Sequence, residues 1–230
     1  MKFGVVVFPG SNCDHDAFYS TSVNAGAEAV YIWHKDTSIP NDIDCIILPG
    51  GFSYGDYLRC GAIAKFSPVM REVINFANKG GYVLGICNGF QILTESALLP
   101  GTLLRNRKLA FACKDVFIKT MNNSSAYTSL LIVNEILRIP IAHGEGNYFA
   151  EPETIAELED TNRIIFKYCD NTGAINDESN PNGSLNNIAG IINEKGNVLG
   201  MMPHPERCCD SILVNTDGLK IFNSLIEHFN

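Results

Sequence analysis

Short apolar runs that alternate with helical stretches are the feature that most constrains the fold of this 230-residue chain. The run from Phe3 to Phe8 is rich in valine and continuously apolar, which is typical of a strand buried on both faces of a parallel sheet. Ala29 to Trp33, Cys45 to Leu48 and Tyr82 to Ile86 predict three more such strands. Short glycine-rich turns join several of these strands to the next element, as in α/β proteins.

Helical stretches separate these strands. One follows Asp14 and is expected to end near Ala25. Ser67 and Pro68 have the residue types of a helix N-cap and a first helical position, and the apolar residues after them recur with helical spacing. A helix over Asn88 to about Leu98 directly follows the fourth strand.

The second half of the chain has a different pattern, because its predicted strands have no long helices between them. These strands are Asp115 to Lys119, Arg163 to Cys169, Ile188 to Ile192 and Val198 to Met202, with a hairpin turn at 193–196 and a last helix from Thr216. The sequence therefore predicts one α/β domain over residues 1–230. We expect a mostly parallel central sheet with helices on both faces and antiparallel additions.

Composition excludes several classes of function. The net charge of -8 and the lack of a basic cluster argue against binding to nucleic acid. There is no signal-peptide pattern and no run of the roughly 20 apolar residues that cross a membrane, so we expect a cytoplasmic protein. The eight cysteines include no Cys-x-x-Cys pair, so no structural metal is expected. No phosphate-binding loop of the G-x-x-x-x-G-K-[ST] type occurs, and we expect no cofactor in this chain.

The segment around Cys87 carries the strongest chemical signal. Gly85 and Gly89 flank the cysteine where a buried strand meets a helix, which resembles the nucleophile elbow of serine hydrolases. A side chain there lies at the carboxyl edge of the sheet and at a helix N-terminus, whose partial positive charge favours anionic groups. The alternative is that Cys87 is a small buried apolar residue, the commonest role of a free cysteine.

A cysteine nucleophile needs a base, and His204 is the candidate. Pro203 and Pro205 hold the chain around it extended, so Glu206, two residues further on, is expected on the same side as the imidazole. A carboxylate in that place would fix the tautomer of the ring, as the acid of a catalytic triad does. Taken alone, the segment better suits a proline-rich turn with a surface histidine, but beside the predicted elbow at Cys87 the triad becomes the better account.

Three other segments have alternatives that the residues leave open. The turn after the third strand offers the backbone N–H of Gly51 for an oxyanion, with the N–H of Asn88 as second donor; otherwise it is an ordinary tight turn. The loop from His143 to Tyr148 is either the wall of a site or a surface loop. Cys208 and Cys209 are better suited to packing than to zinc.

These residues resemble the signature of class I glutamine amidotransferases, with their flavodoxin-like fold. Longer motifs are similar to one family in particular, the glutaminase subunits of phosphoribosylformylglycinamidine synthase. The matching segments are Phe8 to Asp14, Gly51 to Arg59, Cys87 to Gln91, Ala142 to Tyr148, Asn180 to Ser184 and Gly200 to Arg207. The similarity extends over nearly the whole chain, with these segments in the same order, and the stretch from Lys119 to Arg138 matches the family's pattern least.

The resemblance implies a function. Cys87 would attack the side-chain amide of glutamine, His204 would transfer the protons, and Glu206 would orient His204. It further implies backbone N–H groups near Gly51 and Asn88 at the oxyanion. Gln91 and the backbone of Gly51 and Phe52 would hold the amino-acid end of the substrate.

Ammonia would pass to a large synthase subunit that uses ATP and Mg²⁺ to make formylglycinamidine ribonucleotide in purine biosynthesis, and a third small subunit is expected in the complex. Two alternatives stay open on the sequence alone. One is a γ-glutamyl peptidase-like hydrolase with the same three residues. The other is a binding subunit without activity.

Overall fold

A nine-stranded sheet forms the centre of the computed structural model, which describes residues 1–229. One half of the sheet is parallel, with the order β2-β1-β3-β4-β11. The remaining strands, β10, β9, β6 and β7, each pair antiparallel with their neighbours. The parallel strands are β1 (Lys2–Val7), β2 (Glu28–Trp33), β3 (Cys45–Leu48), β4 (Tyr82–Ile86) and β11 (Val198–Met201).

The antiparallel additions complete one continuous sheet. They are β6 (Ala112–Thr120), β7 (Ile136–His143), β9 (Ile164–Cys169) and β10 (Ile188–Ile192). Because every pair from β11 to β7 is antiparallel, the strand direction alternates there. Within this sheet, only β10 and β6 run opposite to the other strands. A separate two-stranded sheet pairs β5 (Thr102–Leu104) with β8 (Asn147–Phe149). The predicted mixed, mostly parallel sheet is therefore confirmed.

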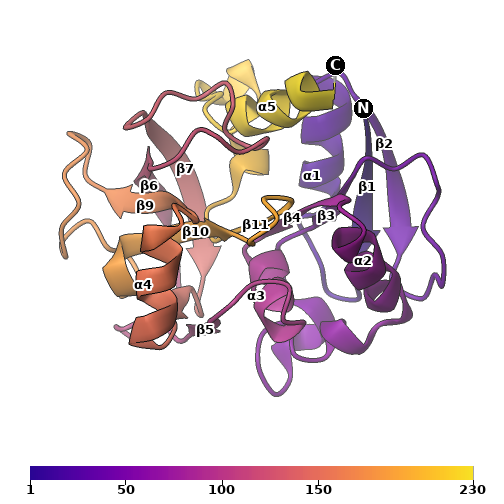
Figure 1. The fold of residues 1–230 in the computed structure, drawn as a ribbon, viewed down its shortest axis with the longest axis horizontal. Helices are drawn as coiled ribbons and strands as arrows, with labels where there is room; N and C mark the ends of the chain where they lie inside the picture. The colour runs from indigo at the N-terminus through magenta and orange to yellow at the C-terminus, as the bar shows by residue number, and fades with distance from the viewer. Residues whose placement is uncertain (230) are drawn as a thin grey trace.

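Helices cover both faces of the parallel half, as expected (Figure 1). Helices α1 (Asp14–Tyr19) and α5 (Leu219–Phe229) lie on one side of the central strands, and α2 (Pro68–Asn78) and α3 (Asn88–Glu95) lie on the other. Helix α4 (Pro152–Asp160) lies beside the antiparallel strands. Phe3 of β1 packs edge-on against Phe222 of α5 with ring centroids 6.5 Å apart, so the apolar stripe of α5 joins the core of the sheet. No helix within residues 1–229 is long and apolar enough to span a membrane.

Two helix termini differ from the predictions for local reasons. The α-helix after Asp14 ends at Tyr19, and a π-helical turn continues it over Ser20–Asn24. In that turn the Ser20 hydroxyl donates to the backbone carbonyl of Glu206, which ties the end of the helix to a distant loop. Ser67 does precede α2, but its side chain makes no cap and bonds instead to the hydroxyl of Tyr54.

The ends of two other helices also shift. Helix α3 ends at Glu95 rather than near Leu98, because Ala97 takes a left-handed backbone conformation and the next amides bond back to Leu93. Helix α5 begins at Leu219, three residues later than expected from the sequence.

Several elements of the second half were missed. Strand β7 contains Pro140, which argues against a central strand, but β7 lies at the edge of the sheet, where a missing N–H is tolerated. Helix α4 is short and buries only Leu158, so its apolar periodicity is weak. Strands β5 and β8 have three residues each, too few for a pattern.

Close packing of α3 on β3 gives a first prediction. A Cβ on Gly89 would lie 1.9 Å from the backbone oxygen of Leu48, and a backbone atom cannot move away as a side chain can. We expect Gly89→Ala to lower the free energy of unfolding by about 3 kcal/mol or more. Gly196→Ala is the control, because its Cβ meets open space and only the backbone conformation, with φ of 74°, opposes it. That variant should lose about 1 kcal/mol. Equal losses in urea titrations would refute the steric argument.

Candidate active site

The parallel half of the sheet brings the predicted functional residues to one edge. Strands β1, β3, β4 and β11 run in the same direction, so the segments that follow them meet at their carboxyl ends. Cys13, Gly51, Cys87 and His204 each follow one of these strands in the chain. Strand β7 runs in the same direction and ends at His143, which adds a fifth segment to this edge.

Cys87 occupies a strained turn between β4 and α3. Its backbone has φ of 51° and ψ of −104°, a conformation that costs a non-glycine residue on the order of 1–3 kcal/mol and that is concentrated at functional sites. Gly85 and Gly89 make the turn possible, since a Cβ on Gly85 would lie 2.7 Å from the carbonyl oxygen of Gly89. The Cys87 thiol is buried and faces the backbone carbonyl of Ala142 at 3.7 Å. The predicted elbow thus has the geometry of a nucleophile turn.

His204 and Glu206 are paired as the sequence predicts. The Nδ1 atom of His204 lies 2.6 Å from Oε1 of Glu206, and both side chains are buried. The backbone N–H of His204 donates to the carbonyl of Pro140 on β7, which fixes the position of the ring. A carboxylate on Nδ1 leaves Nε2 as the atom free to exchange protons. That Nε2 atom is buried and has no hydrogen-bond partner within residues 1–229.

The surroundings of His204 favour its protonated form. Burial works against a charged imidazole, but the negative charge of Glu206 and the nearby thiol of Cys87 outweigh it and hold the pKa of His204 well above its usual range. A buried cation that is paired in this way is suited to stabilising a thiolate nearby. The structure therefore brings Cys87, His204 and Glu206 together.

A second thiol, Cys13, lies against the same imidazole. It is buried, and its sulfur accepts a hydrogen bond of 3.1 Å from Nη2 of Arg207. Ligand atoms of Cys13, His204 and Glu206 lie within 4.8 Å of one another, so these residues are the candidates for holding a metal ion. The guanidinium of Arg207 already places a positive charge beside the sulfur, and Glu206 occupies Nδ1 of His204, so the arrangement favours an ionic network over a metal centre.

The thiol of Cys87 opens into a cavity of about 170 Å³. Its wall combines the predicted substrate residues with others that the sequence did not single out as site residues. It is lined by Gly51, Phe52, Asp56, Cys60, Cys87, Gln91, Phe111, Ala142, His143, Gly144 and Glu145. The loop that starts at His143 is therefore part of the site wall, which resolves the alternative that the sequence left open.

The backbone amides of Gly51 and Asn88 are the predicted oxyanion donors, and Gly51 lines this cavity. Gly51 has φ of 126°, and a Cβ there would lie 2.6 Å from the backbone nitrogen of Asn12, so only glycine fits. Asn88 is the first residue of α3, where backbone N–H groups have no partner within the helix. The Asn88 side chain accepts from the N–H of Ser53, which connects the helix start to the loop after β3.

The predicted substrate residues Phe52 and Gln91 already have protein partners. The backbone N–H of Phe52 donates to the carbonyl of Gly10 and is therefore not free for a ligand. The Phe52 ring stacks on Phe111, and both residues line the cavity. The amide of Gln91 donates to the backbone carbonyl of Glu145 at 2.6 Å and accepts from Asn88 at 2.8 Å. A ligand that uses Gln91 must replace one of these bonds.

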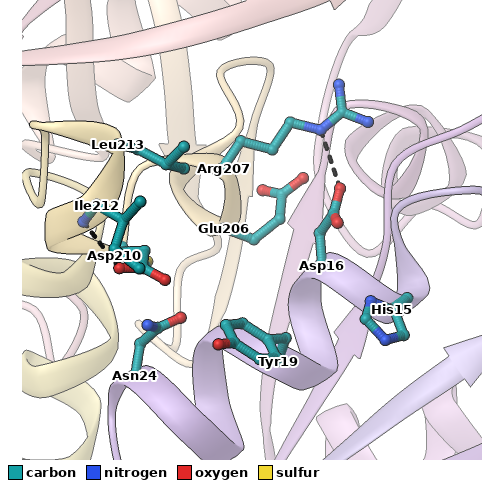
Figure 2. A pocket seen from close by; sticks show the side chains of 10 residues that line it. His15, Asp16, Tyr19, Asn24, Glu206, Arg207, Asp210, Ile212 and Leu213 are labelled. Atoms are coloured by element: carbon teal, nitrogen blue, oxygen red, sulfur yellow. Dashed lines mark hydrogen bonds and ion pairs between the residues drawn. The ribbon is translucent and has the colours of Figure 1, made fainter.

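A larger cavity of about 440 Å³ lies beside the carboxylate of Glu206 (Figure 2). Glu206 and Arg207 form one wall, and Asp16, Tyr19 and Leu213 line the remainder with other side chains. Arg207 donates to Asp16 across its mouth at 3.1 Å. Neither Cys87 nor His204 lines this space, so its size does not make it the reaction chamber. The smaller cavity is the candidate active site because it contains the thiol.

The chain is similar to known proteins along nearly its whole length. A family model described as the CobB/CobQ-like glutamine amidotransferase domain matches residues 1–227. The phosphoribosylformylglycinamidine synthase subunit PurQ of Moorella thermoacetica is 56% identical over 227 residues, which cover 99% of this chain and 96% of that protein. The subunit of the same name from Salinibacter ruber is 52% identical with the same coverage. A chain in the structure of PurLQS from Thermotoga maritima matches with a TM-score of 0.87 at 41% identity, covering 100% of this chain and 99% of that one.

Burial of His143 gives a prediction for stability. Burial, together with the positive charge of His204, lowers the pKa of His143 to about 4. Below the ordinary histidine pKa of about 6.5, the unfolded chain binds a proton that the folded chain refuses, so stability falls as the pH drops from 6.5 towards 4. Between pH 7 and pH 5, this term removes about 2 kcal/mol from the free energy of unfolding.

We expect His143→Gln to lose that part of the pH dependence in urea titrations at the two pH values. The control is His15→Gln, because His15 is exposed and does not line the cavity that contains Cys87. Parallel curves for the wild type and His143→Gln would show that His143 is protonated in the folded protein.

Proposed function

This chain belongs to the CobB/CobQ-like glutamine amidotransferases and, within them, to the PurQ family, and from that premise we propose that it is the glutaminase subunit of phosphoribosylformylglycinamidine synthase. The observation that carries the proposal is the strained Cys87 turn beside a buried histidine–carboxylate pair at 2.6 Å. Such a group of residues is suited to acyl transfer through a thioester.

The proposed reaction has two halves. The Cys87 thiolate attacks the side-chain carbonyl carbon of glutamine, and protonated His204 donates its proton to the departing ammonia. The thioester that remains is hydrolysed by water, from which His204 removes a proton as the carbon–sulfur bond breaks and glutamate leaves. Glu206 keeps the imidazole in the correct tautomer and balances its positive charge.

Backbone groups stabilise the intermediates in this proposal. The N–H groups of Gly51 and Asn88 point to the negative oxygen that forms during both halves of the reaction, where one such donor is typically worth about 3 kcal/mol. Gln91 and the Gly51–Phe52 segment hold the amino-acid end of the substrate. For Gln91 this requires an exchange of its bond to Glu145, and Phe52 contributes its ring because its N–H is already bonded.

The ammonia is passed to partners in the same proposal. A large synthase subunit binds ATP and Mg²⁺ and uses the ammonia to make formylglycinamidine ribonucleotide, and a third small subunit completes the complex. We also propose that residues 1–230 form one domain, which the continuous sheet and core support. A cytoplasmic location agrees with eight cysteines that are all unpaired in the structure.

Replacement of the thiol tests the proposal directly. Cys87→Ala should lower glutamine-dependent product formation by the complex at least ~10³-fold, because no nucleophile remains, while synthesis from added ammonium salts should stay at the wild-type rate. The measurement is product formation with each nitrogen source in the presence of the synthase subunit. Cys113→Ala is the control, since this thiol is exposed and Cys113 is not among the residues that line the cavity.

Two results would count against the proposal. Loss of both activities in Cys87→Ala would make this residue structural, and unchanged glutamine-dependent activity would support a binding subunit without catalysis. Efficient cleavage of γ-glutamyl peptides by the wild type without any partner would favour the peptidase alternative.

The carboxylate of Glu206 is tested by a graded series. Glu206→Ala should reduce glutamate release by roughly 10²-fold or more, because the tautomer and the charge of His204 are no longer controlled. Glu206→Asp should be milder, since the carboxylate is kept at a longer distance. The measurement is kcat for glutamate release by the complex, with circular dichroism to confirm folding. Equal losses in both variants would mean that Glu206 does not act through a placed carboxylate.

A further inference from the structure

Two carboxylates line the cavity that holds Cys87, and the thioester chemistry uses neither of them. They belong to Asp56 and Glu145, which come from the loop after β3 and the loop after β7. The residues that line this cavity include no lysine and no arginine. The wall therefore carries negative charge without a matching cation inside the cavity.

Asp56 is held in place by the backbone on one side and by an amide on the other. Tyr54, Gly55 and Asp56 all take left-handed backbone conformations, which turn this short loop back towards the start of α3. There the side-chain amide of Asn88 donates to Oδ1 of Asp56 at 3.3 Å. Burial and the nearby charge of Glu145 raise the pKa of Asp56, which is the sign of a carboxylate that lacks a positive partner.

The carboxylate of Glu145 lines the same cavity, and its negative charge is only weakly balanced by a cation. Its backbone carbonyl is fixed by Gln91, and its side chain is mostly covered. The nearest cation, Arg105, lies 3.6 Å away, but 77% of its side chain is exposed, so water screens most of that attraction. Cys60 lines the same cavity as both carboxylates, and burial together with their negative charges raises the pKa of its thiol.

An independent group in the wall also lacks a partner. Nδ1 of His143 lies 3.2 Å from Oδ1 of Asn106, whose NH₂ group donates to two backbone carbonyls, so the oxygen accepts and Nδ1 carries the proton. Nε2 of His143 is then an acceptor, and it is buried without a partner within residues 1–229. A buried acceptor of this kind can take a hydrogen bond from a ligand that enters the cavity.

We propose that Asp56, together with Glu145, forms the site that binds the α-ammonium group of the substrate and so selects a free amino acid over amides that lack it. This inference rests on the proposed glutaminase function. A primary ammonium supplies the positive charge that this wall lacks and hydrogen-bond donors for its unpaired acceptors. Ammonium ion formed as product has the same chemistry, and the experiment separates the two sources.

The test compares L-glutamine with glutaramate, which has the same side-chain amide and carboxylate but no α-ammonium. In the complex with the synthase subunit, Asp56→Asn should lower kcat/KM for L-glutamine roughly 10- to 100-fold, mostly through KM, because one charge-assisted hydrogen bond is lost. It should leave kcat/KM for glutaramate unchanged. Glu145→Gln should act in the same direction, and Asp56→Glu should recover part of the preference.

Asp177→Asn is the matched control, since Asp177 is exposed and does not line the cavity. Equal losses for both substrates in Asp56→Asn would overturn the inference, because Asp56 would then serve the chemistry, the release of ammonium or the fold. The proposed function has a separate outcome. If the wild-type complex releases no glutamate, that function fails.

If the wild-type complex is inactive, binding of L-glutamine to Cys87→Ala still tests the ammonium site. Calorimetry should show weaker binding of L-glutamine in Cys87→Ala/Asp56→Asn than in Cys87→Ala alone by the same 10- to 100-fold, since binding needs no nucleophile. Equal affinities in the two proteins would overturn the inference whatever the activity of the complex.

Discussion

Parallel strand pairing is the constraint on which the rest of this structure depends. It places the carboxyl ends of β1, β3, β4 and β11 side by side, and the cavity is built from the loops that leave these ends and the end of β7. A single antiparallel exchange among the four would send one loop to the opposite edge. The side chains of these four strands are nearly all buried and apolar, so the register that aligns the loops is fixed by the core.

The charge state of each buried histidine in the site depends on whether a paired negative group outweighs the cost of burial. His204 is fully covered, yet its charge is favoured because Glu206 and a thiol lie beside it. His143 is equally covered but has only an amide oxygen on its ring, and its neutral form is favoured. The two histidines lie close enough for the charge of one to disfavour the charge of the other. Two buried histidines close to Cys87 thus favour opposite charge states, His204 the cation and His143 the neutral ring.

The sequence predicted the parallel half of the fold and the three central site residues for identifiable reasons. Buried parallel strands are continuous apolar runs, and the glycines around Cys87 are required by contacts with backbone atoms, so both leave a clear pattern. Asp56, Cys13 and the partner of His143, Asn106, were not predicted as site residues. Their positions depend on loop conformation, such as the left-handed turn at Asp56, and on contacts between segments far apart in the chain.

The hydrogen bond between Gln91 and the carbonyl of Glu145 joins the first turn of α3 to the loop at 144–146. A ligand that takes over the Gln91 amide releases this loop, and a loop held away from α3 leaves the amide free for the ligand. Thermodynamic linkage makes the two effects equal in size. A protein that docks on the 144–146 loop in its released position would therefore raise the affinity of the cavity by the same factor by which the ligand strengthens docking. Communication between the two surfaces would need no change in the sheet.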